Sequence, residues 1–81
     1  MRNVIETAIG TLHKLDDGGW CISESHTWRP GVFADKYTAR VALSFTDEVL
    51  QAVQDAVKPN AITASDLGSF LLQFRESAFG A

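Results

Sequence analysis

The side chains that could carry nucleophilic chemistry in this chain are one cysteine, Cys21, and two histidines, His13 and His26. A thiol beside an imidazole is the arrangement of a cysteine nucleophile and its base. No third group that would orient the imidazole is evident, and the sequence indicates no site that would stabilise an oxyanion. We therefore expect no catalytic residues, and we interpret Cys21 as a small buried thiol beside a surface histidine.

The same residues are a poor set of metal ligands. A structural zinc site needs about four ligands, usually in close pairs such as Cys-x-x-Cys, whereas this chain has a single cysteine and two histidines. Ser23, Ser25, His26 and Asp35 include the residue types of a hydrolase triad, but a triad is defined by geometry and no Gly-x-Ser-x-Gly elbow is present. The sequence therefore predicts a protein that is not an enzyme and that has no metal and no cofactor.

Residues suited to binding are easier to find. Trp28 lies in a polar stretch beside Arg29 and Pro30, and tryptophan and arginine are enriched at the energetic centres of protein interfaces. Trp28 is either such an anchor or a lid over a small core, and the sequence leaves both open. Lys36 and Arg40 fall one helical turn apart and complete the set of candidate interaction residues.

Composition and charge limit the classes of partner. The chain has 81 residues, which we interpret as one small domain, and 46% of them are hydrophobic. Its net charge of −3 makes nucleic acid a possible but disfavoured partner. A single cysteine fits a reducing compartment, so we expect a cytoplasmic protein. No signal peptide and no apolar run long enough to span a bilayer are recognisable.

The first half of the chain has the pattern of a β-hairpin. Residues 4–15 can be drawn as a helical stripe, but Gly10 and a high content of β-branched residues favour a strand. The sequence LDDGGW has turn chemistry, and WCISES then alternates. We predict a hairpin of about 4–15 with 20–25, turning at Asp16–Gly19. Residues 26–32 form a loop or a short edge strand.

Residues 36–44 fit two structures. The apolar odd positions from Tyr37 to Phe45 alternate as in a strand, whereas Asp35 can cap a helix whose inward side carries Tyr37 and Val41. We prefer the helix because it also places Lys36 and Arg40 together on an outer face.

Two further helices are predicted from their caps. Thr46 precedes a helix that ends near Lys58-Pro59, and Thr63 with Asp66 begins a last helix over about 64–77. The last helix has an apolar face formed by four residues: Leu67, Phe70, Leu71 and Phe74. The predicted fold class is α+β: an N-terminal β-hairpin, with a short third strand as an option, followed by three helices packed on one face.

Several segments resemble a group of short bacterial proteins without an assigned activity. The likeness spans residues 10–67 and rests on a Gly-Trp strand, a Pro-Gly-aromatic-Ala turn into a helix, and an Ile-Thr-x-x-Asp-Leu tail. The strand–strand–helix outline is also similar to HicB-type antitoxin domains and to integrase arm-binding (AP2-like) domains. The second likeness would imply strands that read DNA, but these strands carry only His13 and Lys14 as potentially basic residues, and the second strand carries the acidic Glu24. No DNA-reading residue is therefore carried over.

Two functions follow as expectations. The first is a small non-catalytic protein-interaction module in the cytoplasm that can also associate with itself, using Trp28, Arg29, Pro30, Lys36 and Arg40. The alternative is a DNA-associated accessory or antitoxin-like protein of a mobile element or phage, which would bind through the Lys36/Arg40 face.

Overall fold

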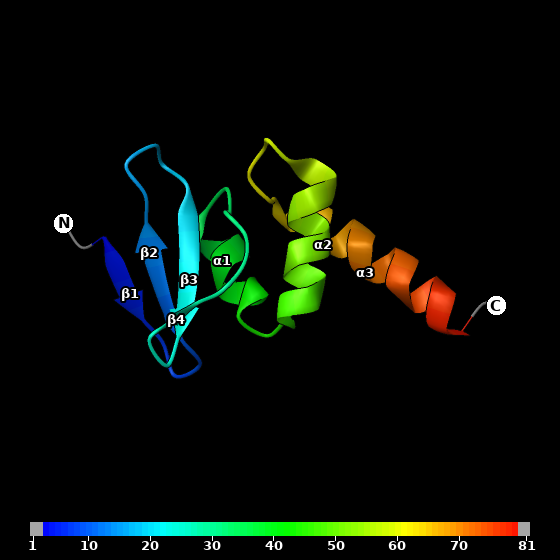
Figure 1. Cartoon of the computed structure of the whole chain (residues 1–81), viewed down its shortest axis with the longest axis horizontal. Coiled ribbons are helices and arrows are strands. Elements are labelled where there is room, and N and C mark those ends of the chain that lie inside the picture. Colours follow the sequence, from blue (N-terminus) through cyan, green and yellow to red (C-terminus); the bar gives the residue numbers. More distant parts are fainter. Residues whose placement is uncertain (1–2, 80–81) are drawn as a thin grey trace.

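Residues 3–79 form a four-stranded antiparallel sheet and three helices. The computed structural model describes the backbone of residues 3–79 and the side chains of residues 3–72. The strands follow one another along the sheet in chain order, and the helices come after them (Figure 1). Their bounds are β1 Val4–Glu6, β2 Thr11–Lys14, β3 Trp20–Glu24, β4 Thr27–Trp28, α1 Lys36–Ala42, α2 Asp47–Val57 and α3 Ala64–Phe79. The predicted α+β class is confirmed.

The prediction of one strand over 4–15 is wrong, because the chain reverses direction within it. Thr7 closes a turn: its hydroxyl donates to the Gly10 carbonyl at 2.7 Å and accepts from the Gly10 amide at 3.0 Å. Gly10 is required here, since a Cβ atom would lie 2.7 Å from the Ser23 carbonyl oxygen and 2.7 Å from Leu43 Cδ2. The segment is therefore a hairpin of its own, β1–β2, with Ile5 opposite Leu12.

The second hairpin, β2–β3, was predicted correctly. Its turn is closed by the Leu15 amide, which donates to the Gly19 carbonyl at 2.7 Å, and Gly18 adopts a φ of +92° that suits glycine. The segment 26–32 supplies the optional short strand, β4, which pairs antiparallel with the end of β3.

Helix α1 confirms the preferred structure for 36–44, but its predicted orientation is wrong. Asp35 caps it as expected, accepting from the Thr38 amide at 2.8 Å. Tyr37 and Val41, which we expected to face inward, are 71% and 52% exposed. The buried side consists instead of Thr38, Ala39 and Ala42. These small side chains let α1 lie close to β2 and β3, where a tyrosine would not fit.

The caps of α2 and α3 are as predicted. Thr46 accepts from the Val49 amide, and Thr63 and Asp66 form a reciprocal capping box. On α3, Leu67 is buried and Phe70 packs against the core, but Leu71, expected on the buried face, is 48% exposed because the helix leaves the body at this point. Phe74 lies outside the described side chains.

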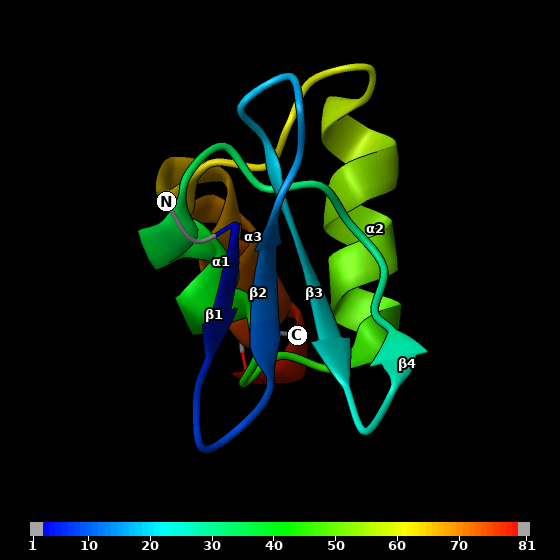
Figure 2. The same ribbon diagram turned by 90° about the vertical axis from the view of Figure 1, so that its left-hand side faces the viewer.

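Phe33 joins the sheet to the helices. It is fully buried, and its backbone bridges Trp20 at the start of β3 on one side and Ile62, just before α3, on the other. Trp20 is itself buried and belongs to the core. The helices lie on one side of the sheet (Figure 2). The predicted packing of three helices on one face differs in detail: α1 packs on the sheet, whereas α3 packs on α1 and α2 and then extends away (Figure 1).

Candidate functional site

The side of the sheet opposite the helices is the candidate site, and strand alternation decides which residues it carries. Ile5, Leu12 and Ile22 are register partners that point toward the helices. Their neighbours along the strands therefore point the other way, where no helix of residues 3–79 lies (Figure 2). We call this surface the open face; it carries seven side chains: Val4, Glu6, Thr11, His13, Cys21, Ser23 and Trp28.

Two rows of side chains cross the open face. Val4, His13 and Cys21 are register partners over the first three strands. The second row crosses all four strands and consists of Glu6, Thr11, Ser23 and Trp28. An uncovered sheet face with a mixture of aromatic, hydroxyl and charged groups is suited to contact with another molecule.

Trp28 is the most exposed apolar group on this face. Its side chain is 63% exposed, so the interpretation as a lid over the core is wrong. The indole lies against the imidazole of His13, with ring centroids 4.5 Å apart and planes tilted by 57°. His13 is held in turn by a hydrogen bond of 2.8 Å between its Nε2 and the Ser23 hydroxyl. The fixed imidazole thus supports one side of the indole, while most of the tryptophan surface stays accessible.

The turn before β4 fixes the direction of Trp28. Glu24 and Thr27 are paired, so the hairpin loop contains only Ser25 and His26, with φ values of 51° and 66°. Two positive φ values are those of a type I′ turn, which usually contains glycine or asparagine. This turn matches the twist of the sheet at the cost of an unfavourable backbone conformation for both residues.

Arg29, the next residue, makes its side-chain contacts within the protein. Its side chain is only 9% exposed, and its guanidinium donates to Asp47 Oδ1 at 2.7 Å, to the Leu43 carbonyl at 2.9 Å and to the Phe45 carbonyl. These acceptors lie at the end of α1 and the start of α2. Arg29 therefore ties the edge strand to both helices, and each of its three guanidinium nitrogens already donates to a partner within the protein.

Lys36 and Arg40 lie elsewhere. Both are exposed on α1, which sits behind the β1 side of the sheet, whereas β4 forms the opposite edge (Figure 2). Lys36 Nζ lies 5.4 Å from the centre of the Tyr37 ring. The structure thus separates the predicted residues into the Trp28 segment, with Pro30 half-buried beside it, and the exposed face of α1.

The nucleophile considered from the sequence does not have the environment of a reactive thiol. Cys21 lies directly opposite His13 on the neighbouring strand, but His13 Nε2 is paired with Ser23. Burial raises the pKa of the Cys21 thiol, which is opposite to the shift that activates cysteine. Asp35 is engaged in capping α1. Among the described residues, no three His, Cys, Asp or Glu side chains gather as a metal site.

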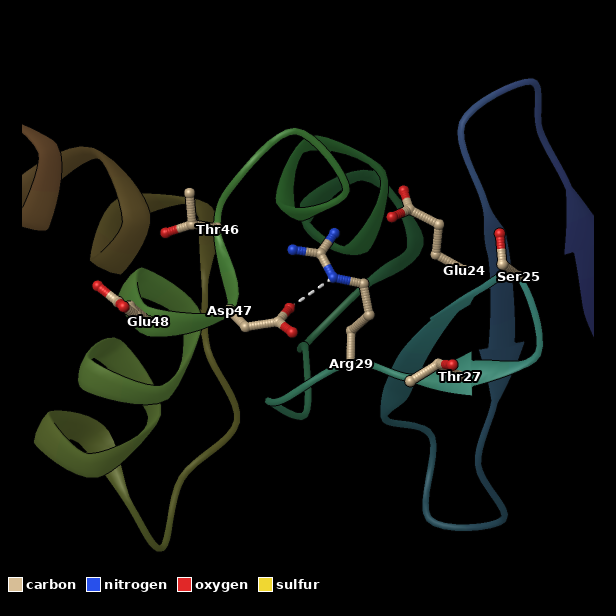
Figure 3. A pocket seen from close by; sticks show the side chains of 7 residues that line it. All are labelled: Glu24, Ser25, Thr27, Arg29, Thr46, Asp47 and Glu48. Atoms are coloured by element: carbon tan, nitrogen blue, oxygen red, sulfur yellow. Dashed lines mark hydrogen bonds and ion pairs between the residues drawn. The ribbon is translucent and has the colours of Figure 1, made fainter.

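An open cleft lies between the β3–β4 turn and the start of α2 (Figure 3). It measures about 670 Å³, and its charged lining residues are Glu24, Asp47, Glu48 and the internally bonded Arg29. Sequence reasoning did not anticipate it, because it depends on how β4 meets α2. The partnership of His13 with Trp28 was missed for a related reason, since it requires the β3–β4 register.

Comparison of the chain with family models, curated proteins and solved structures found no match. Within the part of the chain that is described, none of the helices combines the length and the apolar character that crossing a membrane requires.

Proposed function

We propose that this protein is a small non-catalytic interaction module of the cytoplasm whose open face binds a partner protein around Trp28. The observation that carries this proposal is the indole of Trp28, 63% exposed on a sheet face that no described helix covers and backed by His13. Tryptophan on a rigid support loses little conformational freedom when it binds, and such residues dominate binding energies at many interfaces.

The electrostatics of the open face support a protein partner rather than nucleic acid. Glu6 is the charged residue in the row that contains Trp28, and the chain carries a net charge of −3. A nucleic-acid surface would instead need clustered lysine and arginine. The single cysteine, with its raised pKa, supports a role without thiol chemistry in a reducing compartment.

The experiment uses a photo-crosslinking amino acid in place of Glu6, which is exposed in the same row of the open face, so that Trp28 stays intact while the partner is captured in cells. Affinity measurements with the purified partner follow. Trp28→Ala should weaken binding by about 30-fold or more, as at an interface hot spot. Tyr37→Ala is the matched control, because Tyr37 is an aromatic residue of similar exposure, 71%, on α1. Equal binding by the wild type and Trp28→Ala would overturn the proposal.

A second candidate function rests on α1. Lys36 and Arg40 are exposed one turn apart, and among the described residues neither takes part in an ion pair. This pair supports weak contact with phosphates in a DNA-associated or antitoxin-like protein. The test is binding of random duplex DNA at low salt, which Lys36→Ala with Arg40→Ala should abolish; absence of any binding by the wild type would remove this candidate.

A further inference from the structure

Helix α3 carries more apolar surface than its packing uses. Leu67 is 2% exposed and Phe70 packs against the core, so these residues account for the side of the helix that faces α1 and α2. Leu71 and Leu72 follow directly, and they are 48% and 63% exposed. In Figure 1 the second half of α3 extends beyond the other helices. The leucines thus lie where the helix leaves the body.

Gly68 lies one turn before Leu72 and on the same side of the helix. It is exposed, and apart from its chain neighbours and the adjacent backbone of its own helix, a Cβ atom added to it would meet no described atom within 4 Å. Glycine inside a helix costs about 1 kcal/mol relative to alanine. Packing within the described chain gives no reason for this cost. A close approach by another helix would, because an absent side chain leaves a hollow in the helix surface.

We propose that a second copy of this chain docks on this surface, with the two α3 helices antiparallel and Leu72 of each copy seated over Gly68 of the other. With a two-fold axis between the helices, Leu72 of each copy fills the hollow at Gly68 of the other copy. A symmetric dimer needs this kind of self-complementary surface. A parallel pair would place Leu72 against Leu72 and leave both hollows empty. The α3 surface is separate from the open face, so this inference does not depend on Trp28.

Sedimentation equilibrium over about 5 to 500 µM protein tests the proposal, a range that covers the weak association expected of a small interface. The wild type should show a reversible monomer–dimer equilibrium. Leu72→Gln and Gly68→Gln should each weaken dimerisation by about tenfold or more. Gly68→Gln is the sharper variant, because glutamine is the better helix former. The monomer should melt at a higher temperature while it associates more weakly, so a folding defect cannot explain the loss.

Ala52→Gln is the matched control, because Ala52 is exposed on a different helix, α2. It should leave the dimerisation constant unchanged, as should Trp28→Ala, which separates this interface from the open face. In a Cys21→Ser background, a mixture of Gly68→Cys and Leu72→Cys chains should form the mixed disulfide faster than either chain forms its own. A wild type that stays monomeric, a dimer insensitive to Gly68→Gln and Leu72→Gln, or equal weakening by Ala52→Gln would overturn the proposal.

Discussion

Arg29 and Asp47, eighteen positions apart in the chain, form an ion pair in which Nε donates to Oδ1 at 2.7 Å (Figure 3). The two side chains differ in environment: that of Arg29 is 9% exposed and that of Asp47 is 64% exposed. The arginine also holds the Leu43 and Phe45 carbonyls, so it is the member on which the junction of sheet and helices depends.

Arg29→Ala should therefore lower the free energy of unfolding by about 2–4 kcal/mol, since two backbone carbonyls and a carboxylate lose their donor. Asp47→Ala should cost less than about 1 kcal/mol, because its partner keeps two acceptors and the carboxylate is mostly in water. Urea denaturation followed by tryptophan fluorescence measures both. Equal losses from the two substitutions would contradict the assignment of the junction to the arginine.

Gly10→Ala should destabilise the protein by about 2 kcal/mol or more, because the new methyl group would collide with the Ser23 carbonyl and with Leu43. Thermal unfolding detects the loss. Gly68→Ala, which meets open space, should raise stability by about 1 kcal/mol at protein concentrations too low for association. Opposite signs for these two identical substitutions are the outcome that the structure requires.

The pH dependence of stability should contain a contribution from Asp35. The hydrogen bond from the Thr38 amide is the main cause that holds the pKa of this carboxyl below its usual 3.8. A folded pKa below the unfolded one stabilises the fold above pH 3.8, and this stabilisation disappears as the pH falls through the folded pKa. Asp35→Asn keeps a capping side chain that does not titrate. Denaturation from about pH 6 to about pH 2 should show the stability advantage of the wild type over Asp35→Asn shrinking with acid; a constant difference would show that Asp35 does not contribute.

Alkylation of Cys21 should be slow at neutral pH. Burial raises the pKa of its thiol, so the reactive thiolate is scarcer than in a free cysteine. Iodoacetamide labelling followed by mass spectrometry should give a lower rate for the folded than for the urea-unfolded protein, and His13→Ala should not lower it further. Labelling faster than that of the unfolded chain would mean that Cys21 is activated.

Local signals in the sequence predicted the elements well. Asp35, Thr46 and Thr63 each begin a helix because capping depends on residues within one turn. The β2–β3 turn is equally local, since Gly18 and Gly19 lie between its strands. The turn at Thr7–Gly10 was missed because it contains no Asn-Gly or Asp-Gly pair, which is the usual sequence signal of a tight hairpin turn. The Thr7 hydroxyl closes it instead, by bonding to the Gly10 amide and carbonyl.

Orientation and long-range pairing were the parts that the sequence could not predict. The inward side of α1 was misassigned because its closeness to β2 and β3, and not hydrophobicity, selects Ala39 and Ala42 over Tyr37. The contact of Trp28 with His13 depends on a type I′ turn at Ser25 and His26, neither of which is a residue typical of that turn. The structure separates the five predicted interaction residues into the Trp28 segment and the exposed face of α1, and it places His13, which was not among them, beside Trp28.

The backbone bridges of Phe33 have a consequence for how this chain unfolds. Its amide and carbonyl pair with Trp20, and the neighbouring Ala34 amide donates to Ile62 at 2.8 Å, so a strand and the approach to the last helix share one short segment. Separating the sheet from the helices would therefore break the backbone hydrogen bonds that Phe33 and Ala34 make with Trp20 and Ile62. We expect a single all-or-none transition, with fluorescence and circular dichroism melting together, and an excised N-terminal fragment ending at residue 34 should remain unstructured.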